Sequence, residues 1–206
     1  NNDDQVSTSP FDEMLTMVKG VYSPERFLEI FRDYIYFQDK EYDDKEKEIV
    51  CRYPQFFATR LLRESIVKSV KEKSGKGGTY FGATGCGKTY TMLFLSRLIA
   101  LRDNEAFKNP TIVILEDRED LDTQTSELFV TAKKYLHQSD VRSIESREDM
   151  EKTLRDKPSG GVYITTIQKF CEKTGLLSDR SNIICISDEA HRTQTGVGAK
   201  LKKTDK

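Results

Sequence analysis

Residues Gly82-Ala83-Thr84-Gly85-Cys86-Gly87-Lys88-Thr89 decide the fold that we expect for this chain of 206 residues. They match GxxxxGK[ST], a phosphate-binding loop whose successive backbone N–H groups wrap the phosphates of a nucleotide. Residues 78–81 ahead of the loop predict a short buried strand, and residues 88–101 predict a helix. The N-terminus of such a helix adds positive potential at the phosphates. The sequence therefore predicts a nucleotide site at a strand–helix junction.

The side chains of this loop suit the chemistry of a nucleotide with Mg²⁺. Lys88 is expected to reach the β- and γ-phosphates, and the Thr89 hydroxyl is expected to bind Mg²⁺. The glycines leave the backbone room for a close approach to the phosphates. An ordinary glycine-rich turn is the alternative, and the strand and helix expected on either side argue against it. The predicted ATP-binding residues of the loop are Thr84, Gly85, Cys86, Gly87, Lys88 and Thr89.

An acidic motif follows an apolar run near the end of the chain. Residues 183–186 predict a buried strand, and Asp188-Glu189-Ala190-His191 comes shortly after it. We expect Asp188 to hold Mg²⁺, directly or through water, and Glu189 to orient or deprotonate the attacking water. His191 could sense the γ-phosphate, couple hydrolysis to motion, or simply bond nearby backbone. A solvated acidic turn is the alternative. The predicted catalytic residues are thus Lys88, Asp188, Glu189 and His191, and the predicted Mg²⁺ ligands are Thr89 and Asp188.

The composition excludes several classes of protein. Lys and Arg (33) nearly balance Asp and Glu (34), so DNA binding would need a local basic surface. The four cysteines form no CxxC pair, which favours reduced thiols in a cytosolic protein. No apolar run reaches transmembrane length and the N-terminus is unlike a signal peptide, so we expect a soluble, cytoplasmic protein. The first residue, Asn1, and the lysine-rich end indicate a piece of a longer chain.

The first 78 residues predict a helical region. Residues 1–9 are polar and predict a disordered tail. Apolar residues at helical spacing predict helices over 10–20 and 24–35, whose aromatic side chains we expect in a core or on a docking surface. The charged residues 38–48 predict an exposed connection, and a third helix is expected from Pro54 through Val70.

From residue 79 onward the predicted elements alternate between strands and helices. Continuous apolar strands separated by helices indicate a parallel sheet covered on both faces, with ligands bound at the carboxyl ends of its strands. Residues 146–149 resemble a capping box that opens a short helix. The predicted strands are 79–81, 111–115, 141–144, 162–165 and 183–186, and the other predicted helices are 88–101, 121–136 and 167–170.

Six segments together resemble the R (motor) subunit of type I restriction enzymes, which belongs to superfamily 2 of helicases and translocases. The phosphate loop and the DEAH sequence resemble motifs I and II of that superfamily. The more specific segments are RYPQFFA at 52–58, similar to the Q-motif region, DREDLDTQ at 117–124, similar to DRxDLDxQ, TTIQKF at 165–170, similar to TTxQKF, and DEAHRTQ at 188–194. The helical pair at 10–37 resembles the segment ahead of the motor in this family.

The resemblance implies further site residues and a division into domains. Gln55 would read the adenine edge with Arg52 close to the base, and a polar residue at a helix start is the alternative for Gln55. Asp117, Asp120 and Asp122 would structure their loop. The implied DNA contacts are Arg118, Gln124, Thr165, Thr166 and Gln168. The implied domains are a disordered tail (1–9), a helical extension (10–50), a first RecA-like P-loop NTPase domain (51–196) and a truncated tail (197–206).

The resemblance also implies a function in a bacterial or archaeal cytoplasm. A parent protein would couple Mg²⁺-ATP hydrolysis to translocation of double-stranded DNA, together with methylation and specificity subunits, before endonuclease cleavage. The nuclease domain and the second motor domain would lie outside this chain, which should bind ATP weakly and hydrolyse it very poorly. The alternatives are another superfamily 2 motor, such as a type III restriction or repair helicase, and a nucleotide-gated interaction module without useful hydrolysis.

Overall fold

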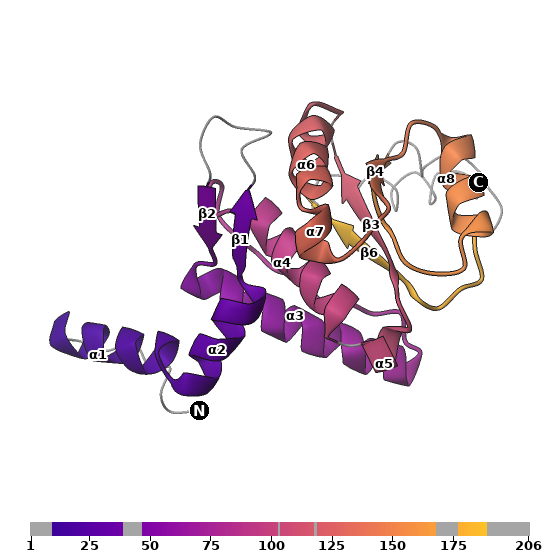
Figure 1. The fold of residues 1–206 in the computed structure, drawn as a ribbon. Coiled ribbons are helices and arrows are strands. Elements are labelled where there is room, and N and C mark those ends of the chain that lie inside the picture. The colour runs from indigo at the N-terminus through magenta and orange to yellow at the C-terminus, as the bar shows by residue number, and fades with distance from the viewer. Residues whose placement is uncertain (1–9, 39–46, 103, 118, 168–176, 189–206) are drawn as a thin grey trace, which may run out of the picture.

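The computed structural model describes residues 10–38, 47–102, 104–117, 119–167 and 177–188 (Figure 1). The helices are α1 (Pro10–Val21), α2 (Pro24–Asp33), α3 (Tyr53–Glu72), α4 (Lys88–Leu101), α5 (Asn104–Phe107), α6 (Glu119–Thr131), α7 (Lys133–Leu136) and α8 (Arg147–Asp156). The strands are β1 (Ile35–Gln38), β2 (Lys47–Val50), β3 (Thr111–Glu116), β4 (Val141–Ser143), β5 (Val162–Thr166) and β6 (Ile183–Ser187). No helix among these residues has the length and apolar character needed to span a membrane.

Four parallel strands form the central sheet in the order β4-β5-β3-β6. In β3, Ile112 is opposite Val162 of β5 on one side and Ile184 of β6 on the other. The strands are short runs rich in branched apolar residues, which suit a sheet buried on both faces. The predicted α/β class with a parallel sheet is therefore confirmed.

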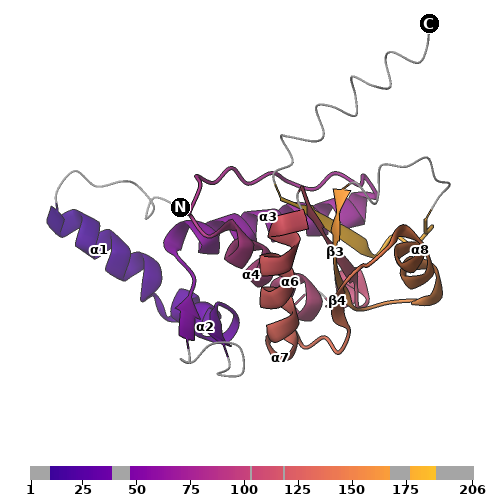
Figure 2. The same ribbon diagram turned by 90° about the horizontal axis from the view of Figure 1, so that it is seen from above.

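Helices cover both faces of this sheet (Figure 2). One face joins the main core, which contains Ile112, Ile114 and Ile164 together with apolar residues of α4 and α6. The other face carries Val113 and Tyr163. These two side chains pack with Ile144 and with Met150 and Leu154 of α8. Because successive side chains of a strand point to opposite faces, one apolar strand supplies both clusters.

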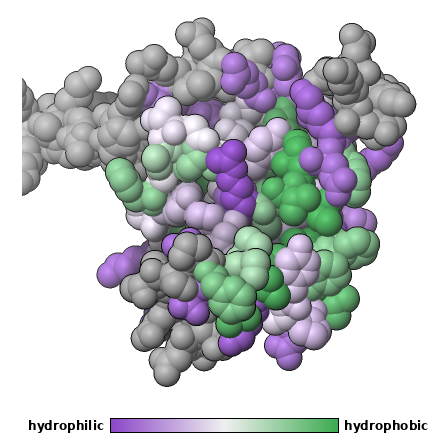
Figure 3. Space-filling view, turned by 90° about the vertical axis from the view of Figure 1, so that its left-hand side faces the viewer, coloured by the Kyte–Doolittle hydropathy of each residue, from purple (hydrophilic) through white to green (hydrophobic). Residues whose placement is uncertain are grey.

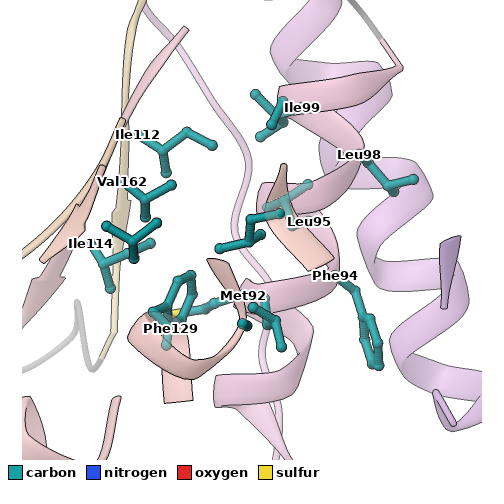
Figure 4. Close-up of a cluster of buried hydrophobic side chains, with 14 of the residues drawn as sticks. Met92, Phe94, Leu95, Leu98, Ile99, Ile112, Ile114, Phe129 and Val162 are labelled. Carbon is teal, nitrogen blue, oxygen red and sulfur yellow. The ribbon is translucent and has the colours of Figure 1, made fainter. Parts of the chain in front are cut away.

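Helix α4 is buried along most of its length. Every residue from Thr91 to Ala100 is buried. In Figure 4, Met92 lies toward the end of the sheet marked by Ile114 and Ile99 lies toward the end marked by Ile112, so α4 runs against the direction of β3. Its first turn consequently lies at the carboxyl edge of the sheet, where α/β proteins bind ligands.

The expected strand at 79–81 is wrong. Residues 74–80 have no regular structure, and Phe81 is 95% exposed. The segment leading to it lies against α3, where the Ser65 hydroxyl donates to the Gly77 carbonyl at 3.0 Å. A strand is stable only when a neighbour takes up its backbone hydrogen bonds. None of the strands in the described part of the chain pairs with residues 79–81.

Two expectations for the N-terminal region are also corrected. The second helix ends at Asp33 rather than at residue 35, and Ile35–Gln38 forms β1. This strand pairs antiparallel with β2, so the ends of the expected connection at 38–48 form a ladder. Tyr34 and Tyr36 both reach the main core. Residues two apart lie on the same face of a strand but not of a helix, so burial of both tyrosines favours the extended backbone. The remaining expected helices and strands are confirmed, except that Ala132 separates α6 from α7 and residues 168–170 lie outside the described part.

The aromatic and apolar side chains of α1 and α2 remain largely at the surface. Phe11 and Phe31 are each 68% exposed, whereas Tyr34 is fully buried. Figure 3 looks onto the side of the molecule where these helices lie in Figure 1, and it shows hydrophobic patches beside hydrophilic side chains. The expected core role therefore holds for Tyr34, whereas Phe11 and Phe31 are exposed, and a docking role for them stays a prediction.

A buried carboxylate attaches α2 to the main core. Asp33 is fully buried, and the Arg102 guanidinium at the end of α4 donates to both of its oxygens at 2.5–3.0 Å. Arg97 approaches the same carboxylate at 3.6 Å and donates to the carbonyl of Arg32 at 3.0 Å. A buried charge is tolerated only when it is paired and hydrogen-bonded. The interaction therefore fixes where the N-terminal helices meet the sheet domain.

Replacing Asp33 by Ala should strongly destabilise the fold. The substitution leaves two arginines partly buried without their carboxylate, which costs about 3–5 kcal/mol. Urea unfolding followed by circular dichroism measures this change. Asp179→Ala at an exposed position is the control and should stay within about 0.5 kcal/mol of the unaltered protein. An equal effect of the two substitutions would contradict a structural role for Asp33.

The exposure of Phe81 leads to a second prediction. Phe81→Ser should change the free energy of unfolding by no more than about 0.5 kcal/mol, because the ring buries almost no surface. Phe94→Ala in α4 should cost about 3–5 kcal/mol, because its ring is fully buried. The same urea titration measures both. A large loss for Phe81→Ser would show that residues 79–81 form a packed strand in solution.

Candidate nucleotide-binding site

The phosphate loop adopts the backbone geometry that its glycines permit. Gly85 and Gly87 have φ angles of +78° and +83°, in the left-handed region that glycine occupies without steric cost. The Cys86 N–H donates to the Ala83 carbonyl at 3.2 Å and closes a turn. Gly87 is the N-cap of α4, so the helix begins at Lys88. The loop therefore ends in a helix N-terminus, where backbone N–H groups and the helix dipole favour an anion.

Lys88 and Thr89 stand in the first turn of α4, and both are half-buried. Apolar residues of α4 pack in the main core, and this packing fixes the start of the helix at the carboxyl edge of the sheet. This is the place that the sequence predicts for the two side chains. Because the rest of α4 is buried, the positions of Lys88 and Thr89 are fixed. The phosphate loop itself remains accessible to solvent, since Thr84 and Gly85 are exposed.

Asp188 lies at the same edge, directly after β6. Its N–H donates to the Leu115 carbonyl at 2.9 Å and extends the parallel ladder with β3 by one bond. The sheet thus positions the Asp188 backbone, and the carboxylate is half-buried. Glu189 and His191 lie outside the described residues, as do Arg118 and Gln168.

The donor set fits Mg²⁺. Thr89 offers a hydroxyl oxygen and Asp188 a carboxylate, and Mg²⁺ at nucleotide sites takes few protein oxygens together with phosphate oxygens. The described residues hold no group of three or more His, Cys, Asp and Glu side chains that could bind a metal ion without the nucleotide. Thr89 and Asp188 are therefore the residues here that would hold the ion.

Gln55, which the resemblance implies as the reader of the adenine edge, makes hydrogen bonds with protein groups at both ends of its amide. Its side chain is buried, and its Oε1 accepts the backbone N–H of Arg52 at 2.7 Å. Its Nε2 donates to the Gly87 carbonyl at 2.8 Å and lies 3.5 Å from the Cys86 carbonyl. Both ends of the amide therefore bond to protein, and the oxygen keeps a second lone pair. Arg52 is exposed at the N-cap of α3.

The expected DNA contacts fall into two groups. Thr165 and Thr166, at the end of β5, are buried, and neither hydroxyl has a hydrogen-bond partner within the described structure. Contact with DNA through these hydroxyls would require them to be uncovered. Gln124 is exposed on α6, so its side chain is accessible to DNA. Asp117 follows β3 directly, and the side chains of residues 119–123 are outside the described part.

Sequence reasoning did not single out Glu116. It is the last residue of β3, it is buried, and it is opposite Thr166 in the register. Its backbone neighbour Leu115 accepts the hydrogen bond of Asp188. A carboxylate at the end of an otherwise apolar strand is the signal that could have drawn attention to it.

The thiols of the described cysteines form no disulfide. Cys51, Cys86 and Cys185 are free, in agreement with the expectation of reduced thiols. Burial raises the pKa of the Cys51 thiol to about 12, so this group stays protonated and unreactive at neutral pH.

Comparison with known proteins agrees with this geometry. Residues 54–204 match the family model of the SWI2/SNF2 ATPase. The endonuclease subunit of the type I restriction enzyme HindI from Haemophilus influenzae is 34% identical over 92% of this chain. A putative type I restriction endonuclease subunit from Methanocaldococcus jannaschii, MjaIXP, is 32% identical over 91%. One from Staphylococcus aureus COL, SauCOLORF180P, is 30% identical over 68%.

The chain spans 18% of the length of the first two of these relatives and 15% of the third. Within that span the match includes the phosphate loop, the sheet and Asp188. The resemblance to R subunits drawn from the sequence motifs is confirmed. The chain belongs to the SWI2/SNF2 ATPase family, and its relatives over most of its length are endonuclease subunits of type I restriction enzymes.

Proposed function

We propose that this chain is the nucleotide-binding half of a motor that uses ATP hydrolysis to move double-stranded DNA. The observation that supports the proposal is that α4, which begins at the phosphate loop, runs opposite to β3, while Asp188 directly follows β6, so both are on the side of the carboxyl ends of the parallel strands. The names of the relatives, which are endonuclease subunits of restriction enzymes, support DNA as the substrate. The protein would act in the cytoplasm within a complex that includes methylation and specificity subunits.

The residues of this chain have distinct parts in such a reaction. Backbone N–H groups of residues 85–89 and the Lys88 ammonium would bind the β- and γ-phosphates and offset their charge. Thr89 and Asp188 would hold Mg²⁺, which supplies electrostatic stabilisation of the transferring phosphoryl group. Glu189 would align the attacking water and take up its proton, and His191 would couple hydrolysis to movement of the protein.

DNA would be held by contacts that do not depend on sequence. Gln124, Arg118 and Gln168 supply amide and guanidinium donors to phosphates, which give grip without base recognition. Thr165 and Thr166 would join them if the end of β5 is uncovered when DNA binds. A second RecA-like domain, which would supply arginine at the transition state, would work with the first domain at residues 51–196. The isolated chain should therefore bind ATP weakly and turn it over slowly.

Substitution of Lys88 tests the proposed activity in the longer protein that would carry this chain. Lys88→Ala should lower DNA-stimulated ATP hydrolysis by at least about 100-fold, because a preorganised charge at the phosphates is lost. Asp188→Asn should have an effect of similar size through the metal. Phosphate release in the presence of linear double-stranded DNA measures the rate, and displacement of a triplex-forming oligonucleotide measures translocation.

Lys152→Ala is the matched control, because Lys152 is exposed on α8 away from the loop. It should leave both rates unchanged. If Lys88→Ala hydrolysed ATP as fast as the unaltered protein, this site would not be the ATPase site. ATP turnover without displacement of the triplex would contradict translocation while leaving the ATPase intact.

A further inference from the structure

Three neighbouring strands carry polar side chains where they reach the carboxyl edge of the sheet. Thr166 is the last residue of β5, and its partner in the register is Glu116, the last residue of β3. On the other side of β3, Leu115 is opposite Ser187 of β6 and accepts the N–H of Asp188. The next pair in this register is Glu116 and Asp188. Thr166, Glu116 and Asp188 therefore form one row across the sheet, which we call the polar row.

The polar row belongs to the face of the sheet that packs against α4. Successive side chains of a strand point to opposite faces. The residues two positions before each member of the row, Ile114, Ile164 and Ile186, pack in or against the main core. Leu115, one position away, packs against the cluster on the other face. The three polar side chains thus continue the apolar face that α4 covers.

The polar row is level with the first turn of α4. In Figure 4, Met92 lies toward the end of the sheet marked by Ile114. From Met92 back to Thr89 the helix moves about 4.5 Å toward the carboxyl edge, at about 1.5 Å per residue. From Ile114 to Glu116 the strand advances by about 6.6 Å in the same direction, at about 3.3 Å per residue. Glu116 thus reaches the level of Thr89, the residue expected to bind Mg²⁺.

Glu116 places a second carboxylate one strand spacing away from Asp188. The backbones of neighbouring strands are about 4.8 Å apart. Two carboxylates on adjacent strands repel each other, and Glu116 is only 1% exposed, so water screens this repulsion poorly. A buried charge is tolerated when it is paired or lies at a metal ion. The two carboxylates therefore favour a divalent cation at this edge of the sheet.

The hydroxyl of Thr166 adds unused hydrogen-bonding capacity to the polar row. Thr166 is 1% exposed, and its Oγ1 has no hydrogen-bond partner within the described structure. Buried hydroxyls are nearly always bonded to protein or to ordered water. Mg²⁺ gives up its waters reluctantly and usually keeps several of them, and these waters need acceptors. The row offers acceptors for such waters from two side chains.

We propose that Glu116 is a positioning residue for the Mg²⁺ ion, to which it is linked through metal-bound water. Thr89 and Asp188 hold the ion, and Glu116 and Thr166 accept hydrogen bonds from the waters that it keeps. The proposal rests on the proposed nucleotide site and adds to it a residue outside the phosphate loop and the DEAH sequence. Loss of such a partner typically lowers metal affinity about 10- to 100-fold. Loss of the Glu116 charge therefore acts on the metal and spares the nucleotide.

The experiment separates metal binding from nucleotide binding. Calorimetry measures binding of ADP in EDTA and at increasing Mg²⁺, and electron paramagnetic resonance measures binding of Mn²⁺ to the ADP complex. Glu116→Gln keeps the shape of the side chain and removes its charge. It should raise the dissociation constant of Mn²⁺ and the half-saturating Mg²⁺ concentration about 10- to 100-fold. The dissociation constant of ADP in EDTA should be unchanged or lower, because a negative charge near the phosphates is lost.

Glu145→Gln is the matched control. Glu145 is exposed and follows β4 at the same edge of the sheet, so the substitution changes the net charge equally without touching the polar row. It should leave the metal and ADP constants unchanged. Equal effects of Glu145→Gln and Glu116→Gln would show that only net charge acts, and the proposal would be overturned.

Thr166→Val is a second variant that leaves the charge intact, so it tests the polar row even if Glu116→Gln does not fold. Loss of one acceptor should raise the Mn²⁺ constant about two- to tenfold, the effect of roughly one hydrogen bond. An unchanged Mn²⁺ constant in Thr166→Val would contradict the row as a water-binding site.

The remaining outcomes distinguish the proposal from a structural role. Weaker ADP binding in EDTA by Glu116→Gln, with a lower midpoint of urea unfolding, would show that Glu116 supports the fold, and unchanged metal constants would show that it does not serve the ion. Either result overturns the proposal and leaves the nucleotide site in place. Asp188→Asn should remove the Mg²⁺ dependence and shows that the assay detects the metal. If the unaltered protein bound neither ADP nor Mn²⁺, the proposed site would be wrong, and the role of Glu116 with it.

Discussion

The structure depends on the burial of α4 on every side. Ten consecutive residues, Thr91 to Ala100, are withdrawn from water between the sheet and α3. Fully burying a leucine or phenylalanine contributes about 1.5–3 kcal/mol, and α4 supplies several such residues. The helix is therefore the element around which the others pack. Its first turn carries Lys88 and Thr89, so the position of the phosphate loop follows from the packing of the core.

Helix α4 carries few polar side chains that could define its rotation or its position along its axis. Polar contacts at several points along it supply that information, among them the hydrogen bond from Arg97 to the carbonyl of Arg32. At its end, the guanidinium of Arg102 binds the buried carboxylate of Asp33. At its start, Gln55 binds the carbonyl of Gly87. Apolar contacts tolerate a small translation or rotation of the helix. Hydrogen bonds weaken steeply under the same displacement, because their strength depends on distance and angle. These polar contacts thus fix the rotation and the axial position of α4.

The sequence predicted the parts of this arrangement that depend on local pattern. The apolar strands at residues 111–115, 162–165 and 183–186 and the phosphate loop are local features, and all are found. Residues 79–81 have the local character of a strand. A strand also needs a neighbour that pairs with its backbone N–H and C=O groups, and the local sequence does not specify that neighbour. Asp33 and Gln55 could not be placed from the sequence, because their partners Arg102 and Gly87 lie 69 and 32 residues away. The resemblance implied Thr165 and Thr166 as DNA contacts, whereas in the structure both belong to the buried strand β5.

The loop has the backbone shape that phosphate binding needs. Gly85 and Gly87 have positive φ angles, and the Gly87 carbonyl accepts hydrogen bonds from two helices. Ordering a flexible loop costs about 1–2 kcal/mol for each residue that is fixed, so contacts within the fold that hold this shape reduce what binding has to offset. Interactions with the phosphates can then contribute to affinity and to stabilisation of the transition state.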